Sequence, residues 1–218
     1  MRLNCFHSNP LKRATRHLFL LLTLAFILNP STFTNAATII VTSTADSGAG
    51  SLRDAVANAD SADIIVFAPA LNGQTITLTS GSIGFSHMGL TIDATALDSL
   101  IINSGDSSRV FYIQHASPVY LRGVTFKNGY SISGGGAIRF FGRGTNAIIE
   151  SCIFRNNHAD GEGGAIYTNY SNVTISESIF ENNTAGISGG AITNSRANVL
   201  IQSCAIINNS ASWGGGAI

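Results

Sequence analysis

The chain has 218 residues, of which 44% are hydrophobic and only 11% are charged, with twelve basic and twelve acidic side chains. Isoleucine and valine remain plentiful beside the 23 glycines, which excludes disorder and predicts many turns between short buried strands. No basic stripe with interleaved aromatic residues follows the N-terminal leader, which argues against nucleic acid as a partner.

Residues 1–36 are expected to be a secretory signal peptide. A basic cluster at residues 12–17 precedes an apolar run at residues 18–28, which is too short to span a bilayer. Small residues up to Ala36 predict cleavage there. Because the leader holds four of the twelve basic residues and no acidic one, the mature chain carries a net charge of −4. The expected location is therefore extracellular or at the cell outer membrane, reached through the Sec pathway.

Residues 37–106 are expected to form an N-terminal cap and the first coils of a solenoid. Ser51 is a helix N-cap candidate with Asp54 three positions later, which predicts one short helix over residues 51–58. A solenoid end exposes strand edges, so something other than a repeat must cover it. Strand-like runs lie at 38–42, 64–67, 75–78, 90–92 and 100–102.

Residues 107–218 are organised by a repeat of about 26 residues. The tetrapeptide Gly-Gly-Ala-Ile recurs at steps of 28, 26 and 26 residues, and an aromatic or aliphatic residue followed by an Asn-containing turn recurs at the same steps. Each repeat predicts a strand, a bend, a second strand ending in Phe or Ile, an Asn-rich turn, and a glycine pair before a third strand. Such units must stack to bury their apolar faces. The tetrapeptides occupy 135–138, 163–166, 189–192 and 215–218.

Stacking places residues 26 apart about 4.8 Å from each other across a parallel ladder. This spacing predicts an interior column of aromatic and aliphatic side chains and a polar ladder of asparagines at a turn. The glycine pairs are expected to allow positive φ or close backbone approach at a corner. The interior column is Phe126, Phe154, Phe180 and Ile206, and the ladder is Asn157, Asn183 and Asn209.

Two cysteines of the mature chain occupy one predicted column. Cys152 and Cys204 lie two coils apart with Ser178 between them, which separates them by about 10 Å, beyond the roughly 7 Å limit for a disulfide. Both are therefore predicted to be free, buried thiols.

The repeats resemble those of chlamydial-type polymorphic outer membrane proteins, which carry Gly-Gly-Ala-Ile and Phe-x-x-Asn. Gly129 replaces the Asn in the first copy and Ile206 the Phe in the last. The segment Ser51-Leu-Arg-Asp-Ala resembles the Ser-Leu-Arg-Glu-Ala-type start of bacterial exported β-helix proteins, with Asp54 in place of Glu. These resemblances imply an all-β chain: a single-stranded right-handed parallel β-helix, a pectate-lyase-like solenoid with an N-terminal cap.

Pectate lyases and polygalacturonases share this fold, so an enzyme is the rival interpretation. A lyase needs clustered carboxylates for calcium and a basic proton acceptor, and a hydrolase needs paired carboxylates. His158, Asp160 and Glu162 lie in one turn that suits either a metal or acid–base chemistry, but a solvated turn is the simpler interpretation. We therefore assign no catalytic, cofactor-binding or metal-binding residue.

The remaining polar candidates have structural interpretations. Glu150, Glu177 and Glu181 are expected to face solvent singly, and Arg139 with Arg143 to form a surface pair. Asn58-Ala-Asp60 is interpreted as a helix end. Four Asn-x-Ser/Thr sequences are interpreted as turns rather than glycosylation sites; they begin at Asn169, Asn172, Asn182 and Asn208. Three aromatic residues are interpreted either as a carbohydrate-stacking surface or as isolated packing residues: Tyr167, Tyr170 and Trp213.

The expected function is that of a non-enzymatic, surface-exposed or secreted scaffold, an adhesin-like or structural passenger region without a cofactor. The alternative is a carbohydrate-active enzyme, a polysaccharide lyase or glycoside hydrolase. A third hypothesis is a passenger exported through a C-terminal barrel. Expected partners are a host-cell or matrix surface or a polysaccharide, with a membrane reached only through a further C-terminal anchor or barrel. The mature 182 residues allow at most seven coils, fewer after the cap is subtracted, and the ending inside a repeat predicts a truncated fragment.

Overall fold

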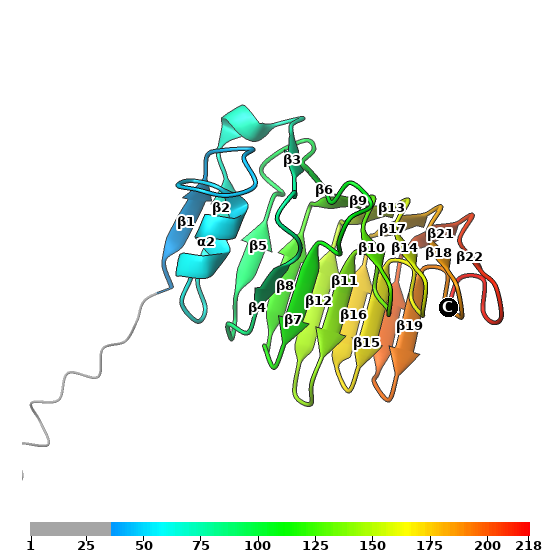
Figure 1. The fold of residues 1–218 in the computed structure, drawn as a ribbon. Helices are drawn as coiled ribbons and strands as arrows, with labels where there is room; N and C mark the ends of the chain where they lie inside the picture. Colours follow the sequence, from blue (N-terminus) through cyan, green and yellow to red (C-terminus); the bar gives the residue numbers. More distant parts are fainter. Residues whose placement is uncertain (1–35) are drawn as a thin grey trace, which may run out of the picture. The chain divides into compact units, whose positions relative to one another are not determined.

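The computed structural model describes residues 36–218, which form one compact unit (Figure 1). The predicted signal peptide lies outside the described residues except for Ala36. No helix within residues 36–218 is long and apolar enough to cross a membrane. The unit is a parallel β-solenoid whose turns stack along one axis.

Four parallel sheets make the walls. Sheet A takes one strand from each of seven turns: β1 (Thr38–Val41), β2 (Ile64–Phe67), β5 (Thr91–Asp93), β8 (Val119–Arg122), β12 (Asn146–Glu150), β16 (Asn172–Ser176) and β20 (Val199–Gln202). Sheet B contains β3 (Thr75–Thr77), β6 (Ile101–Asn103), β9 (Thr125–Lys127), β13 (Ile153–Arg155), β17 (Ile179–Glu181) and β21 (Ala205–Ile207).

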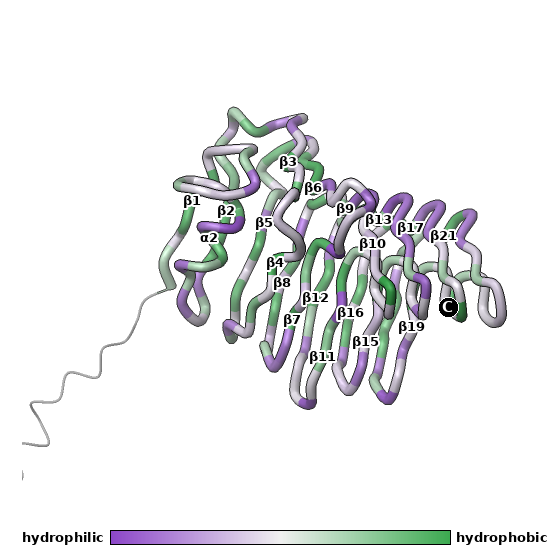
Figure 2. The backbone as a smooth tube through the Cα atoms, in the orientation of Figure 1, coloured by the Kyte–Doolittle hydropathy of each residue, from purple (hydrophilic) through white to green (hydrophobic). Residues whose placement is uncertain are grey.

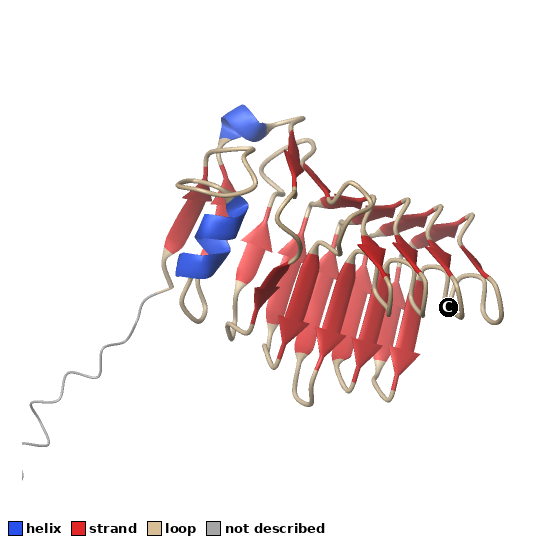
Figure 3. Cartoon of the chain, in the orientation of Figure 1, coloured by secondary structure: helices blue, strands red, loops and turns tan. Residues whose placement is uncertain are grey.

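The other two sheets complete each turn. Sheet C contains β4 (Ile83–Phe85), β7 (Phe111–Gln114), β11 (Ile138–Phe141), β15 (Ile166–Asn169) and β19 (Ile192–Ser195). Sheet D is built from two-residue strands: β10 (Tyr130–Ser131), β14 (His158–Ala159), β18 (Thr184–Ala185) and β22 (Ser210–Ala211). Strands of sheet C run opposite to those of sheet A (Figure 3). The repeat thus holds a fourth short strand that the sequence pattern did not predict.

The strands alternate inward and outward side chains, as the period-2 pattern predicts. In β8, Val119 and Leu121 are buried, whereas Tyr120 and Arg122 are partly exposed. Figure 2 shows the apolar stretches along the strands and hydrophilic residues at many of the turns. All named strand pairs are parallel. Pairs between strands from β8 onward follow the 26- and 28-residue steps of the repeat, whereas pairs that involve earlier strands have steps of 24 to 29 residues.

The predicted interior column is confirmed. Phe126 and Phe154 stack with ring centroids 5.0 Å apart, and Phe154 and Phe180 stack at 4.6 Å with an interplanar angle of 4°. All three side chains are buried, and Ile206 continues the column in β21. Edge-to-face contact with Phe111 extends the aromatic core to the neighbouring column.

The predicted asparagine ladder is also confirmed. The Asn157 side-chain amide donates to the Phe126 carbonyl at 3.1 Å and to Asn183 Oδ1 at 2.9 Å. Asn183 repeats this pattern with Asn209 Oδ1 at 2.9 Å. Where Gly129 replaces Asn, its backbone N–H donates to Asn157 Oδ1 at 2.8 Å, so the ladder ends with its acceptor satisfied. The ladder thereby pairs backbone groups that the bend leaves free.

The glycine pairs make a corner that a side chain would block. Gly163 has a φ of +66°, as expected for the first glycine of each pair. The second glycine permits close backbone approach, since a Cβ on Gly164 would lie 2.1 Å from the Gly190 carbonyl oxygen.

The cap contains helix α2 (Leu52–Asn58) and a short 3-10 turn, η1 (Pro69–Leu71). Ser51 caps the helix by accepting a hydrogen bond from the Asp54 N–H at 3.1 Å, as predicted. Asn58 is the last helical residue, which confirms its interpretation as a helix end. The expectation that the cap reduces the number of coils is wrong, because β1 precedes the helix and already pairs with β2 as the first strand of sheet A.

Cys152 and Cys204 are both free, as predicted, but only Cys152 is buried. Burial raises the pKa of its thiol to about 12, although nearby backbone groups act in the opposite direction. Cys204 is partly exposed, which corrects the prediction of two buried thiols. Its turn is the last described one, so no further described turn covers it.

Candidate functional site

The outer face of sheet C carries arginine and aromatic side chains in register. Tyr112, Arg139 and Tyr167 occupy successive strands at one position, and all three point outward. The Arg139 guanidinium lies 5.1 Å from the Tyr167 ring centroid and 5.5 Å from that of Phe141. Both distances are in the range of cation–π contact.

A second arginine joins this group from the preceding segment. Arg109 lies 5.6 Å from the Tyr112 ring centroid and donates to Ser131 Oγ at 2.5 Å. Arg109 and Arg139 also both donate to Ser133 Oγ, at 3.2 and 3.1 Å. Burial lowers the pKa of Arg109, and the charge of Arg139 lowers it further. Two like charges are therefore held around one hydroxyl.

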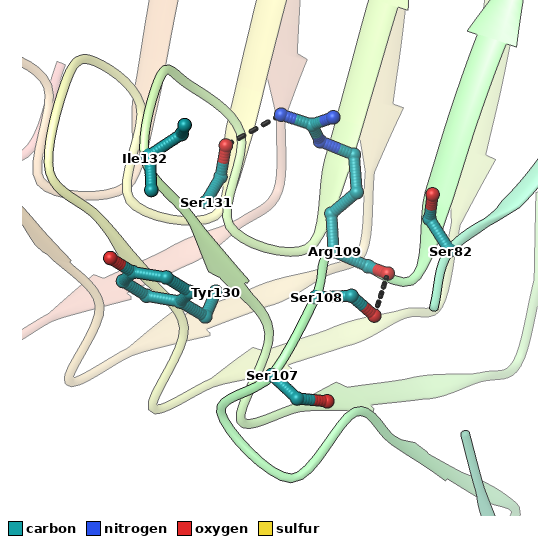
Figure 4. Close-up of a pocket in the computed structure, with 7 residues that line it drawn as sticks. All are labelled: Ser82, Ser107, Ser108, Arg109, Tyr130, Ser131 and Ile132. Carbon is teal, nitrogen blue, oxygen red and sulfur yellow. Dashed lines mark hydrogen bonds between the residues drawn. The ribbon is translucent and has the colours of Figure 1, made fainter. Parts of the chain in front are cut away.

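A shallow cavity of about 200 Å³ adjoins Arg109. Figure 4 shows the Arg109 side chain directed at Ser131, with Tyr130 and the serine hydroxyls around it. The walls therefore offer hydroxyl groups and one guanidinium, which suit a polar ligand. Its lining residues are Ser82, Ser107, Ser108, Arg109, Tyr130, Ser131 and Ile132.

A second cationic group lies where the sheet C strands end. Arg143 and Arg196 lie 5.3 and 5.4 Å from the Tyr170 ring centroid, and Arg196 also donates to the Tyr170 hydroxyl. Both arginines are exposed. The predicted Arg139–Arg143 pair is wrong, because Arg139 lies within β11 and Arg143 in the turn after it, where each contacts different aromatic rings.

These arginines differ from the others in having no carboxylate partner among residues 36–218. Arg122 lies 3.2 Å from Glu150, and Arg155 lies 2.9 Å from Glu181. These glutamates are partly exposed to solvent, as predicted, but they do not stand alone: register brings each beside an arginine 26 or 28 residues away. Glu177 is exposed and accepts from Ser151 Oγ at 3.3 Å.

We define the sheet C face as the outward surface made by four arginines and four aromatic residues. The sequence pattern did not predict this surface, because most of its members lie on different turns of the solenoid. The aromatic and basic residues interleave only after the turns stack. Its members are Arg109, Tyr112, Arg139, Phe141, Arg143, Tyr167, Tyr170 and Arg196.

The turn at residues 158–162 brings together only two of its three predicted candidates. His158 Nε2 lies 3.0 Å from Asp160 Oδ1, and its Nδ1 lies 2.7 Å from Thr184 Oγ1. The Tyr130 hydroxyl donates to Asp160 at 2.6 Å, which lowers the pKa of that carboxyl. Glu162 instead accepts from Ser188 at 3.4 Å. Within residues 36–218, no three His, Cys, Asp or Glu side chains gather as metal ligands.

The remaining candidates separate into different environments. Tyr167 and Tyr170 belong to the sheet C face, whereas Trp213 is 88% exposed in the last turn. Asn182 and Asn208 have positive φ, as turn residues do. Asn169 and Asn172 correct the turn interpretation in part, because they end β15 and begin β16.

Parallel sheets stacked turn upon turn, with an internal asparagine ladder and glycine corners, define a parallel β-helix. Residues 91–217 match the family model described as "Right handed beta helix region". The chain belongs to this family. No curated protein and no solved structure gives a significant match.

Proposed function

We propose that the protein is an exported, non-enzymatic β-helix scaffold that binds a ligand outside the cell, in the manner of an adhesin. The observation that carries the proposal is the regular outer surface: its side chains repeat from turn to turn and bond to one another across the turns. The asparagines 146, 172 and 198 illustrate this, since the Asn172 amide donates to Asn146 at 3.0 Å and the Asn198 amide donates to Asn172 at 3.2 Å.

Charged groups support the same proposal. Arg122 with Glu150 and Arg155 with Glu181 pair across neighbouring turns. Each pair joins opposite charges on the outside of the solenoid and links one turn to the next. The sheet C face is then the part of the outer surface whose positive charges are free to bind a partner. The signal-peptide pattern at residues 1–36 and the resemblance of the repeats to polymorphic outer membrane proteins support export.

A carbohydrate-active enzyme is the second candidate, and one contact favours it. Thr184 Oγ1, the His158 ring and Asp160 are joined by hydrogen bonds in the order hydroxyl, base, acid. This is the order of groups that moves a proton away from a hydroxyl. Their exposure to water weakens the case, because water competes for each of these contacts.

The test measures location, binding and turnover together. Cells that express the full chain are fractionated, and intact cells are treated with protease to detect exposed protein. Purified protein is then incubated with polysaccharides, and both retention and release of soluble or unsaturated products are measured. Export with retention and no product supports the scaffold. A cytoplasmic chain contradicts it, and product release that His158→Ala abolishes favours the enzyme.

A further inference from the structure

The sheet C face concentrates positive charge on a chain that is otherwise acidic. Four arginines lie on it, half of the eight basic residues that follow the predicted leader, whereas the mature chain carries −4 overall. No described carboxylate forms an ion pair with any of the four. A partly buried cation without a counter-ion raises the free energy of the protein. An anionic ligand therefore gains more binding free energy here than beside a fully solvated charge.

Arg109 and Arg139 provide the strongest part of this field. Both guanidinium groups donate to Ser133 Oγ, and neither forms an ion pair with a described carboxylate. Ser133 supplies the only side-chain hydrogen bond of Arg139 within residues 36–218. An anionic group bound beside Ser133 relieves the repulsion between the two arginines. Planar guanidinium donors match the paired oxygens of a carboxylate or sulfate.

Aromatic rings frame these arginines. Tyr112, Arg139 and Tyr167 alternate on three successive turns, and Tyr170 lies between Arg143 and Arg196. Arg139 and Arg143 are four residues apart, so their Cα atoms are separated by at most about 13 Å along the strand direction. A long, flat ligand with repeated negative charges fits this arrangement better than a small molecule does.

The neighbouring cavity adds recognition of neutral groups. Ser82, Ser108 and Ser131 line it beside Arg109 (Figure 4). Serine hydroxyls both donate and accept, and so complement the hydroxyl groups of a sugar. Tyrosine faces next to hydroxyl-rich pockets supply the apolar surface against which sugar rings lie.

We propose that the sheet C face binds an acidic polysaccharide, with its carboxylate or sulfate groups held between Arg109 and Arg139 and between Arg143 and Arg196. This proposal rests on the proposed function, because an exported chain is the one that meets such a polymer. The ligand class of the scaffold is a linear glycan with regularly spaced negative charges. Salt weakens the binding, since the contacts are largely ionic.

The experiment measures Kd for the purified full chain with four probes. Polygalacturonate carries only carboxylates, dextran sulfate only sulfates, and dextran no charge; single-stranded DNA is a polyanion without this sugar chemistry. Binding to polygalacturonate or to dextran sulfate identifies which anion the arginines hold. Equal affinity for neutral dextran overturns the proposal. DNA binding with the same arginine dependence overturns it in favour of a general polyanion surface.

Two variants test whether the arginines bind the polymer, and the Tm of each variant shows whether it still folds. Arg139→Gln removes one cation beside Ser133 and is expected to weaken binding at least tenfold. The double variant Arg143→Gln/Arg196→Gln changes only exposed side chains and is expected to weaken binding about tenfold. Arg155→Gln is the matched control, because Arg155 is equally exposed but paired with Glu181; its Kd stays within twofold. Unchanged Kd in variants that retain the wild-type Tm contradicts the proposal.

The outcomes separate the two proposals. If the chain is exported and binds only neutral surfaces, the acidic-glycan site fails and the scaffold stands. If the acidic polymer is bound through these arginines and also cleaved, the site stands and the non-enzymatic function fails.

Discussion

The Arg53 guanidinium lies 2.7 Å from the Asp46 carboxylate, and this ion pair ties the capping helix to two loops. Arg53 also donates to the Gly81 carbonyl at 2.7 Å, and the Ser80 N–H donates to Asp46 at 2.8 Å. The Ser-Leu-Arg-Asp-Ala segment is thereby explained: Ser51 caps the helix, Leu52 is buried, and the arginine holds the loops. The polar residues of this segment therefore stabilise the N-terminal cap.

The first prediction concerns the pH dependence of the cap. Burial by itself raises the pKa of Asp46, but hydrogen bonds from Ser80 and Arg53 and the charge of Arg53 hold it well below its ordinary 3.8. A depressed pKa in the folded state stabilises the protein above the unfolded value, and this stabilisation is lost as the pH falls through the folded value. Asp46→Asn therefore lowers Tm at pH 7, and the gap from wild type narrows as the pH drops below about 4.

Asp106→Asn is the control for this effect. Asp106 is exposed and forms no ion pair with a described residue. Thermal unfolding of both variants across pH 2–8 checks the prediction. A constant gap between Asp46→Asn and wild type at every pH would show that the carboxylate charge is not what stabilises the cap.

The second prediction tests the asparagine ladder. Asn183→Ala removes the side-chain donor to the Phe154 carbonyl and the Oδ1 acceptor of the Asn157 backbone N–H in a buried turn. Each unsatisfied buried group costs about 1–3 kcal/mol, so the free energy of unfolding falls by about 3 kcal/mol or more. Asn198→Ala, at an exposed outer ladder, is expected to cost below about 0.5 kcal/mol. Urea unfolding measures both, and equal losses would contradict the distinction between the two ladders.

The third prediction tests the glycine corner. In Gly164→Ala the new Cβ meets the carbonyl oxygens of Gly190 at 2.1 Å and Thr184 at 2.5 Å, so the backbone must move. We expect a loss of about 4 kcal/mol or failure to fold. Gly84→Ala is the control, because its nearest atom is 3.7 Å away, an ordinary contact. Its effect is expected to be neutral or slightly stabilising, and a destabilised Gly84→Ala would point to a general intolerance of larger residues in the strands.

The fourth prediction distinguishes the two thiols of the described residues. Cys152 is buried with a pKa of about 12, so little thiolate forms at pH 8, and iodoacetamide should not modify it in the native protein. Cys204 is partly exposed and should react. Peptide mapping after timed alkylation locates the modified residue, with urea-unfolded protein as the reference in which both react. Native labelling of Cys152 as fast as Cys204, or a Cys152–Cys204 disulfide, is inconsistent with the observed register.

Residue spacing alone predicts the stacked columns, because residues 26 apart coincide when similar turns stack. The Phe126–Phe154–Phe180 column, the Asn157–Asn183 ladder and the Ser51-capped helix all follow from spacing and local chemistry. Glycine pairs at the same interval predict the corners for the same reason.

The partners of the surface charges, in contrast, depend on how neighbouring turns pack. Arg122 pairs with Glu150, whereas Arg139 shares the Ser133 hydroxyl with Arg109 and lies beside two aromatic rings. Outward side chains contact neighbours on other turns, so their pairing depends on register and side-chain direction. The insertion of α2 after β1, and the exposure of Cys204 in the last described turn, likewise depend on what packs beside each residue. The periodicity of the sequence specifies which residues form the stacked columns of a solenoid, whereas packing between turns specifies which side chains meet on its outer surface.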